Sequence, residues 1–229
     1  MFLKEIHSEG GKYMRKKYDA VLLDADGTLF DSKDFIHRSF LAALGRHQTS
    51  HVLSWEELTE ICRGMALEEA YRAITGETNV EHFCKTHRAY QHEHEHTLQL
   101  FHGVEKTLTL LWTYGLKLAV VTNRADSVHT TLRRTRLIDF FETVRNLDNT
   151  EGRKKKPHPD MVIDALRILK VDASRAIMVG DTMEDIKAGK AAGVKTVGAA
   201  YGFTGKRIAD YNPDHVIHDI GGLLEILKE

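Results

Sequence analysis

The sequence has little cysteine, no long apolar run and no surplus of charge of one sign. Its two cysteines, Cys62 and Cys84, lie in segments with helical patterns, so neither a disulfide framework nor a CxxC metal site is expected. No stretch of the chain approaches the ~20 apolar residues that a bilayer-spanning helix needs. Residues 1–17 lack the apolar centre of a signal peptide. We therefore expect a cytoplasmic protein with no membrane partner and an N-terminal extension over residues 1–17.

The charges of the chain nearly cancel, with 32 Lys and Arg residues against 33 Asp and Glu residues. Without an excess of positive charge there is no overall field to attract nucleic acid, so no nucleic-acid partner is expected. At 229 residues the chain can bury a full core, as one large domain or two smaller ones. The function must therefore be sought in individual sites.

Short apolar runs alternate with helical patterns along most of the chain. The strand candidates are residues 18–23, 117–122, 176–180, 194–199 and 215–217. This alternation predicts an α/β fold, in which a Rossmann-like parallel sheet has helices on both faces. Its core would comprise residues 18–31 and 101–229.

Residues 32–100 interrupt this alternation with helical patterns and no convincing strand. The helical segments are residues 32–44, 55–63, 67–76 and 80–98. Ser54 and Glu57 have the spacing of a capping box for the second of them. We therefore predict an inserted all-α domain, with hinges near residues 30–33 and 101–104.

Two carboxylates, Asp24 and Asp26, follow directly on the apolar run of the first predicted strand. Ligands of open α/β sheets bind in the crevice beyond the carboxyl ends of parallel strands. The turn at Gly27 and Thr28 allows backbone amides to face a phosphate. One carboxylate can attack phosphorus while the other handles a proton, so the position favours phosphoryl chemistry.

Three further motifs follow in chain order. The first is the pair Thr122 and Asn123, which ends the second predicted strand. The second is Lys156, which precedes Pro157 in a loop before a helical pattern. The third is a GDxxxD segment after another strand, which contains Asp181 and Asp185. Taken singly, these residues have simpler interpretations, as turn residues, helix caps or a solvated loop charge. Their order and their positions at strand ends favour a shared site.

With DADGTLF at residues 24–30, the four motifs together resemble the haloacid dehalogenase superfamily of aspartate-dependent phosphatases and mutases, over residues 18–229. The resemblance implies that Asp24 is the nucleophile and forms an aspartyl phosphate, and that Asp26 is the general acid and base. It implies that Thr122 donates a hydrogen bond to the phosphoryl group and that Lys156 offsets its charge. Lys156 is chosen from the basic run at residues 153–156 because it alone has the KPxP register.

The resemblance also implies a Mg²⁺ ion, which suits hard oxygen ligands that share a site with phosphate. Its ligands would be Asp24, the backbone carbonyl of Asp26 and Asp181, while Asp185 would hold a metal-bound water. The substrate-binding residues would be Gly27, Thr28 and Asn123 in the core and Arg63 in the insert. The insert would act as a lid, and Arg63 would meet a second anionic group, although an exposed arginine at a helix end is an equally good interpretation.

These features predict hydrolysis of a small phosphate monoester, as in phosphoglycolate-phosphatase-like members of the superfamily. Dehalogenases usually lack the second aspartate, and the insert has no recognisable motif for the Schiff-base lysine of phosphonatases. Sugar-phosphate mutases share every core residue named above, so a mutase stays open as an alternative. A phospho-ligand sensor without turnover also stays open, although a pure binder has little use for both a nucleophile and an acid.

Two features depart from a simple pattern. Ala25 stands where the superfamily more often has a bulky apolar residue, so the smaller side chain leaves room near the sheet or changes the packing beneath the loop, and the catalytic pair is unaffected. Five histidines crowd one predicted helix: His82, His87, His92, His94 and His96. The spacing of His92 and His96 permits a transition-metal site, but exposed positions are the simpler interpretation, with His87 and His94 partly packed. Titration of these groups near pH 6.5 would make lid closure pH dependent.

Overall fold

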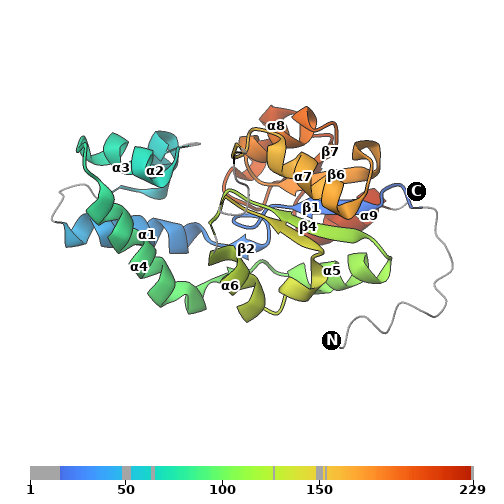
Figure 1. The fold of residues 1–229 in the computed structure, drawn as a ribbon, viewed down its shortest axis with the longest axis horizontal. Helices are drawn as coiled ribbons and strands as arrows, with labels where there is room; N and C mark the ends of the chain where they lie inside the picture. Colours follow the sequence, from blue (N-terminus) through green and yellow to red (C-terminus); the bar gives the residue numbers. More distant parts are fainter. Residues whose placement is uncertain are drawn as a thin grey trace. The chain divides into compact units, whose positions relative to one another are not determined.

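The chain folds into two compact units (Figure 1). Ser32–Gln99 forms one unit, called here the helical unit, and the rest of the chain forms the other, the sheet unit. The computed structural model describes residues 16–47, 53–62, 65–125, 127–147, 152 and 154–227, apart from the side chain of Cys62. The expected N-terminal extension lies outside the described residues except for Lys16 and Lys17.

The sheet unit is built on six parallel strands in the order β5-β4-β1-β6-β7-β8. The strands are β1 Ala20–Leu23, β4 Lys117–Val121, β5 Thr143–Arg145, β6 Ala176–Gly180, β7 Lys195–Ala199 and β8 His215–Ile217. The five predicted strands are confirmed, with ends that differ by up to two residues. β5 was not predicted because its three residues include only one apolar side chain, that of Val144, and so form no apolar run.

Helices cover both faces of this sheet, as predicted. They are α5 Val104–Thr113, α6 Ser127–Arg134, α7 Asp160–Leu169, α8 Met183–Ala191 and α9 Leu223–Leu227, with 3-10 turns η3 Ile138–Phe140, η4 Ala173–Arg175, η5 Gly205–Tyr211 and η6 Ile220–Gly222. On one face, Leu22, Val121 and Met178 pack with residues of α7 and α8, and α5 lies on the opposite side (Figure 1). All four residues of β1 are buried, which explains why this strand is a continuous apolar run.

The helical unit contains α1 Lys33–Arg46, α2 Trp55–Cys62, α3 Leu67–Thr75, α4 Glu81–His94 and the turn η2 Glu95–Thr97. The capping box of α2 is confirmed: the backbone N–H of Glu57 donates to Ser54 Oγ over 3.3 Å, and Ser54 N–H donates to Glu57 Oε2 over 2.9 Å. The first predicted helix was ended too early, because α1 continues through Gly45. The last was too long, because the α-helix ends at His94 and only η2 continues it.

An aromatic cluster forms the interior of the helical unit. The ring of Tyr71 stacks on that of Phe83, with centroids 5.3 Å apart, and Phe40 packs against both Tyr71 and His87. Burial of these large rings contributes hydrophobic stabilisation to this unit. The cluster therefore provides this unit with an apolar core of its own.

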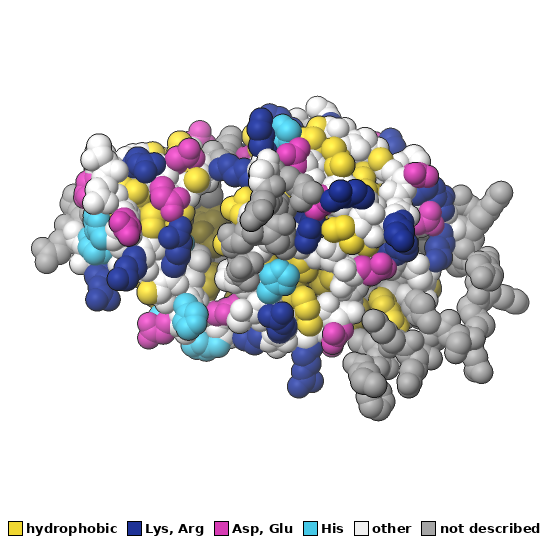
Figure 2. Space-filling model, viewed as in Figure 1, with side chains coloured by type: hydrophobic (Ala, Val, Ile, Leu, Met, Phe, Trp, Pro, Cys, Tyr) yellow, Lys and Arg dark blue, Asp and Glu magenta, His cyan; other side chains and the backbone are white. Residues whose placement is uncertain are grey.

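Two short strands, β2 Phe30–Asp31 and β3 Gln99–Leu100, pair where the chain leaves and re-enters the sheet unit. Each has two residues, too few for a sequence pattern to reveal. Side chains of both signs are interspersed over the face drawn in Figure 2, in keeping with the balanced composition. Among the helices of the described residues, none is long and apolar enough to cross a membrane.

Candidate active site

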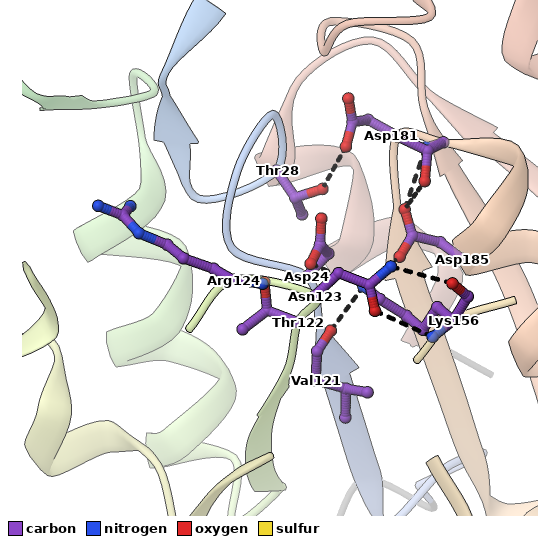
Figure 3. Close-up of polar contacts among 10 residues, drawn as sticks. Asp24, Thr28, Val121, Thr122, Asn123, Arg124, Lys156, Asp181 and Asp185 are labelled. Carbon is purple, nitrogen blue, oxygen red and sulfur yellow. Dashed lines mark hydrogen bonds and ion pairs between the residues drawn. The ribbon is translucent and has the colours of Figure 1, made fainter. Parts of the chain in front are cut away.

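Three neighbouring strands place the candidate catalytic side chains at one edge of the sheet (Figure 3). Asp24 follows β1, Thr122 follows β4 on one side of it, and Asp181 follows β6 on the other. The parallel pairing extends past the strand, since the N–H of Asp24 donates to the carbonyl of Val179 over 2.9 Å. Residues up to 157 positions apart in the sequence are thereby brought together in the crevice where ligands of such sheets bind.

The turn after β1 packs closely against the side chain of Asp181. Gly27 has a φ of +78°, and a Cβ atom added to it would lie 2.2 Å from Asp181 Oδ2, so only glycine fits. The hydroxyl of Thr28 donates to Asp181 Oδ1 over 3.3 Å. Ala25 is fully buried, and its carbonyl accepts the N–H groups of Leu29 and Phe30 over 2.9 Å each. The small side chain at position 25 thus lies beneath a compact turn that holds Asp24 and Asp26.

Lys156 connects the motifs. Its Nζ atom lies 2.7 Å from Asp24 Oδ1 and 2.6 Å from Asp185 Oδ1, and donates to the carbonyl of Val121 over 2.8 Å. An ammonium group has three donors, so these three contacts satisfy it completely. The side chain is buried, as are both carboxylates. Of the lysines in the basic run, the structure thus brings Lys156 to Asp24.

Asn123 holds the backbone of this lysine. Its Nδ2 group donates to the carbonyl of Lys156 over 3.0 Å, and its Oδ1 atom accepts the N–H of Lys156 over 2.9 Å. Both functions of the amide side chain are therefore occupied by the lysine loop. The substrate-binding role predicted for Asn123, through its backbone N–H, does not require this side chain and stays a prediction.

Asp181 and Asp185 are held by different parts of the chain. Asp181 Oδ2 accepts the N–H of Phe203 over 2.7 Å, so the loop after β7 helps to hold the Asp181 carboxylate in place. Asp185 Oδ2 accepts from the N–H and the hydroxyl of Thr182, at 3.0 and 2.6 Å, as the capping box of α8. Phe203 gave no signal in the sequence, because its contribution is a backbone N–H.

Burial and like charge dominate the electrostatics of the site. Burial, with a smaller contribution from the carboxylate of Asp185, raises the pKa of Asp24 to about 7 against the opposing effect of Lys156. Burial also raises the pKa of Asp181 well above its usual range, with contributions from Asp185 and Asp24. Burial alone would lower the pKa of Lys156, but Asp185 and Asp24 raise it above its usual range.

The residues of this cluster fit a divalent cation. Oxygen atoms of Asp24, Asp181 and Asp185 all lie within 4.8 Å of one another, the one such group of potential metal ligands among the described residues. When ionised, the three carboxylates and Lys156 leave two negative charges in a buried place, which a divalent ion would neutralise. Carboxylate oxygens are the ligands that Mg²⁺ and Ca²⁺ prefer, whereas thiols and imidazoles are absent from the group.

Asp26 points to a residue that the sequence analysis missed. Its Oδ1 atom lies 3.2 Å from the Nη1 atom of Arg124, and the Nε of Arg124 donates to Ser127 Oγ over 3.1 Å. The N–H of Arg124 also donates to Thr122 Oγ1 over 3.1 Å. Arg124 lies one residue beyond the Thr-Asn motif, and no spacing rule singled it out.

Arg63 lies outside the described residues. Of the clustered histidines, His94 stacks on Tyr90 and His96 Nδ1 lies 3.1 Å from the carbonyl of Glu93. His87 is buried, and its Nδ1 atom lies 2.9 Å from the hydroxyl of Tyr71. Burial lowers the pKa of His87 to about 3, so the expected titration near pH 6.5 is wrong for this residue.

A family model and curated relatives both match most of this chain. The family model described as haloacid dehalogenase-like hydrolase matches residues 21–199. Pyrophosphatase PpaX of Anoxybacillus flavithermus is 35% identical over 212 residues, which are 91% of this chain and 96% of that protein. PpaX of Bacillus velezensis is 35% identical over 214 residues, 92% of this chain and 97% of its own length.

A crystal structure of a predicted phosphoglycolate phosphatase from Haemophilus somnus shares the fold. Its TM-score is 0.80 at 22% identity, over 93% of this chain and 99% of that one. At this identity the likeness concerns the fold alone. The PpaX relatives are matched over nearly their full length, so no large segment of theirs is missing from this chain.

Proposed function

The chain belongs to the haloacid dehalogenase-like hydrolases and is a phosphatase, and we propose that it is a Mg²⁺-dependent enzyme that transfers the phosphoryl group of a small substrate to Asp24 and then to water. The observation that supports this best is Lys156, which contacts Asp24 and Asp185 in a buried cluster with Asp181. A nucleophile, a countercharge and a set of hard oxygen ligands are thereby assembled in one place.

The proposed substrate is a small phosphate monoester or the smallest phosphoanhydride, pyrophosphate. Pyrophosphate is included because the relatives that are 35% identical are named pyrophosphatases. Phosphoglycolate is included because the motifs resemble phosphatases of that type. Both substrates present a phosphoryl group next to a second anionic group, the kind of group that Arg63 is predicted to meet.

In the first step Asp24 attacks phosphorus. Lys156 binds Oδ1 of Asp24, and within the described chain Oδ2 accepts no hydrogen bond, so this oxygen is available for the attack. A bond forms between Asp24 Oδ2 and phosphorus while the bond from phosphorus to the leaving oxygen breaks. Asp26 supplies a proton to that oxygen, which departs with the bonding electron pair.

In the second step Asp26, now ionised, takes a proton from water. The water oxygen bonds to phosphorus, the bond to Asp24 breaks, and inorganic phosphate leaves. Thr122 accepts a hydrogen bond from the N–H of Arg124, which leaves its own hydroxyl proton for a phosphoryl oxygen. Mg²⁺, held by Asp24, Asp181 and the backbone carbonyl of Asp26, would offset the charge on the phosphoryl oxygens.

The test is phosphate release by the wild type and by Asp24→Asn, with and without Mg²⁺. The substrates are pyrophosphate, phosphoglycolate, nucleotides and hexose phosphates, and the control is Asp139→Asn, which replaces an exposed aspartate of the sheet unit. We expect Asp24→Asn to lose about 10⁴-fold or more in turnover. Full turnover by Asp24→Asn would refute the mechanism. An isomer formed only after priming by a bisphosphate would identify a mutase, and inactivity on every substrate would favour a sensor.

A further inference from the structure

Thr122, Asn123 and Arg124 are consecutive in the turn between β4 and α6 (Figure 3), and their side chains connect this turn to two other parts of the site. Thr122 accepts the N–H of Arg124 on its hydroxyl oxygen, and the side chain of Asn123 holds the backbone of Lys156. The side chain of Arg124 reaches Asp26, 98 positions away in the sequence. The same turn therefore fixes the countercharge of the nucleophile and contacts the proposed proton donor.

The pair of Arg124 and Asp26 is a directed contact in a sheltered place. The Nη1 to Oδ1 distance is 3.2 Å, and the side chains are 10% and 20% exposed. Exposed ion pairs are worth little, but this degree of burial reduces screening by water and salt. The guanidinium is itself oriented, because its Nε donates to Ser127 at the start of α6. The Arg124 guanidinium is thus held by Ser127 through Nε and contacts Asp26 through Nη1.

The second carboxylate oxygen of Asp26 is available for proton transfer. The described chain provides no hydrogen bond to Oδ2, whereas Oδ1 is bound by Arg124. A general acid must lie within hydrogen-bond reach of the oxygen that it protonates. A misplacement of about 1 Å can cost on the order of 10²-fold in rate.

From this geometry we propose that Arg124 is a positioning residue for Asp26. It holds Oδ1 so that Oδ2 faces the leaving oxygen in the first step and the attacking water in the second. The inference rests on the proposed function, since it assigns Arg124 a task in the proton transfers of that mechanism. Arg124 acts through Asp26 and need not touch the phosphoryl group itself.

The first test compares leaving groups in a single turnover. The variants are Arg124→Gln, Arg124→Lys and the control Arg133→Gln, an exposed arginine on α6. For glycerol 2-phosphate, whose alkoxide must be protonated, we expect Arg124→Gln to lose about 10- to 100-fold in rate. For 4-nitrophenyl phosphate, whose leaving group needs no proton, we expect the first burst of nitrophenolate to change less than about 3-fold. Arg124→Lys should recover part of the loss, and Arg133→Gln should resemble the wild type.

An equal loss on both substrates would overturn the proposal, because a general disturbance of the site does not distinguish leaving groups. No loss on either substrate would overturn it as well. Circular dichroism and the thermal midpoint of each variant establish that the comparison concerns folded protein. These readouts keep the inference falsifiable even if Arg124→Gln lowers stability.

The second test is a double-mutant cycle with Asp26→Asn on glycerol 2-phosphate. If Arg124 acts through Asp26, adding Arg124→Gln to Asp26→Asn should change the rate by less than about 2-fold. Additive losses would refute the positioning role. The proposed function fails separately, if Asp24→Asn keeps its turnover. Loss of turnover in Asp24→Asn together with wild-type behaviour of Arg124→Gln would refute only this inference.

Discussion

The two units of the chain bury ionisable groups in opposite ways. In the sheet unit, the ammonium group of Lys156 contacts Asp24 and Asp185, two of the three clustered carboxylates, and burial raises the pKa of Asp24 to about 7. In the helical unit, His87 lies among aromatic rings and burial lowers its pKa to about 3. Burial favours the neutral form in both units, but only the first arrangement keeps a charged group, the Lys156 ammonium, inside the protein.

This difference in buried ionisable groups distinguishes the candidate active site of the sheet unit from the apolar core of the helical unit. Buried charge is costly unless it is paired, and the carboxylates of the sheet unit outnumber the ammonium that pairs with them. Such an imbalance is useful where a cation and a phosphoryl group bind together. The neutral pair of His87 and Tyr71 needs no ligand, because its hydrogen bond over 2.9 Å is internal. The comparison predicts that cations and pH will affect the two units differently.

Removal of Lys156 should have the largest effect on the stability of the sheet unit relative to the helical unit. Lys156→Met leaves buried carboxylates without their countercharge, so we expect the free energy of unfolding of the sheet unit to fall by about 3–5 kcal/mol. Urea unfolding without divalent cations measures this change. Trp112 in α5 is the fluorescent reporter of the sheet unit, in a Trp55→Phe background.

The matched control is Lys106→Met, which replaces an exposed lysine on α5 of the sheet unit. We expect a change within about 0.5 kcal/mol for this variant. If Lys156→Met costs no more than Lys106→Met, the carboxylates are not ionised together in the folded protein. In that case the charge imbalance described above does not exist.

Mg²⁺ should stabilise the sheet unit and leave the helical unit unchanged. A ligand at 100 times its Kd stabilises the folded state by about 2.7 kcal/mol, which calorimetry or urea unfolding detects without any substrate. Asp181→Asn should abolish most of this gain, since it removes one of the three clustered carboxylates. An equal gain in Asp181→Asn, or a gain reported by Trp55 of the helical unit, would contradict a cation site in the cluster.

Acidification should shift the stability of the two units in opposite directions between pH 7 and 5. Asp24 titrates at about 7 when folded and at about 3.8 otherwise, so the folded sheet unit binds the extra proton and gains stability as the pH falls. His87 titrates at about 3 when folded and at about 6.5 otherwise, so the unfolded chain binds the proton and the helical unit loses stability below pH 6.5. Each slope approaches about 1.4 kcal/mol per pH unit.

The two tryptophans make this measurable, because Trp55 reports the helical unit and Trp112 the sheet unit. Urea unfolding of Trp112→Phe and Trp55→Phe at several pH values, without divalent cations, provides the two slopes. Slopes of the same sign would show that the buried groups do not control the pH response. In His87→Phe the slope reported by Trp55 should disappear, while the slope reported by Trp112 should persist.

The sequence predicted the parts of the molecule that depend on local pattern. Apolar runs predicted five of the six strands of the sheet, and carboxylates at strand ends predicted which side chains meet, because parallel strands end at one edge of a sheet. The capping box at Ser54 and Glu57 depends on a spacing of three residues, which a sequence displays directly. The choice of Lys156 from a basic run rested on the register of a motif, and the structure brings its Nζ atom to Asp24.

The parts that the sequence did not predict depend on tertiary contacts. Arg124 is connected to Asp26 by a side-chain direction that no spacing encodes, and Phe203 contributes only its N–H to Asp181. The pKa of His87 depends on its burial, which the partly apolar pattern around it suggested without indicating its extent. β5 is three residues long and owes its place to pairing with β4. Contacts of this kind leave no pattern in the sequence, because they form between residues that only the fold brings together.

The smallest of the predicted changes in stability is expected for Tyr71→Phe. The substitution keeps the ring that stacks on Phe83 and removes the hydroxyl 2.9 Å from His87 Nδ1, which leaves a buried nitrogen without this partner. We expect a loss of about 1–2 kcal/mol in the helical unit, reported by Trp55, and no change in the transition reported by Trp112. Tyr90→Phe is the matched control on α4, where the ring stacks on His94 and the described chain offers its hydroxyl no hydrogen bond. Equal losses in the two variants would show that the stability of the helical unit comes from packing of its rings, and that the buried hydrogen bond contributes nothing beyond it.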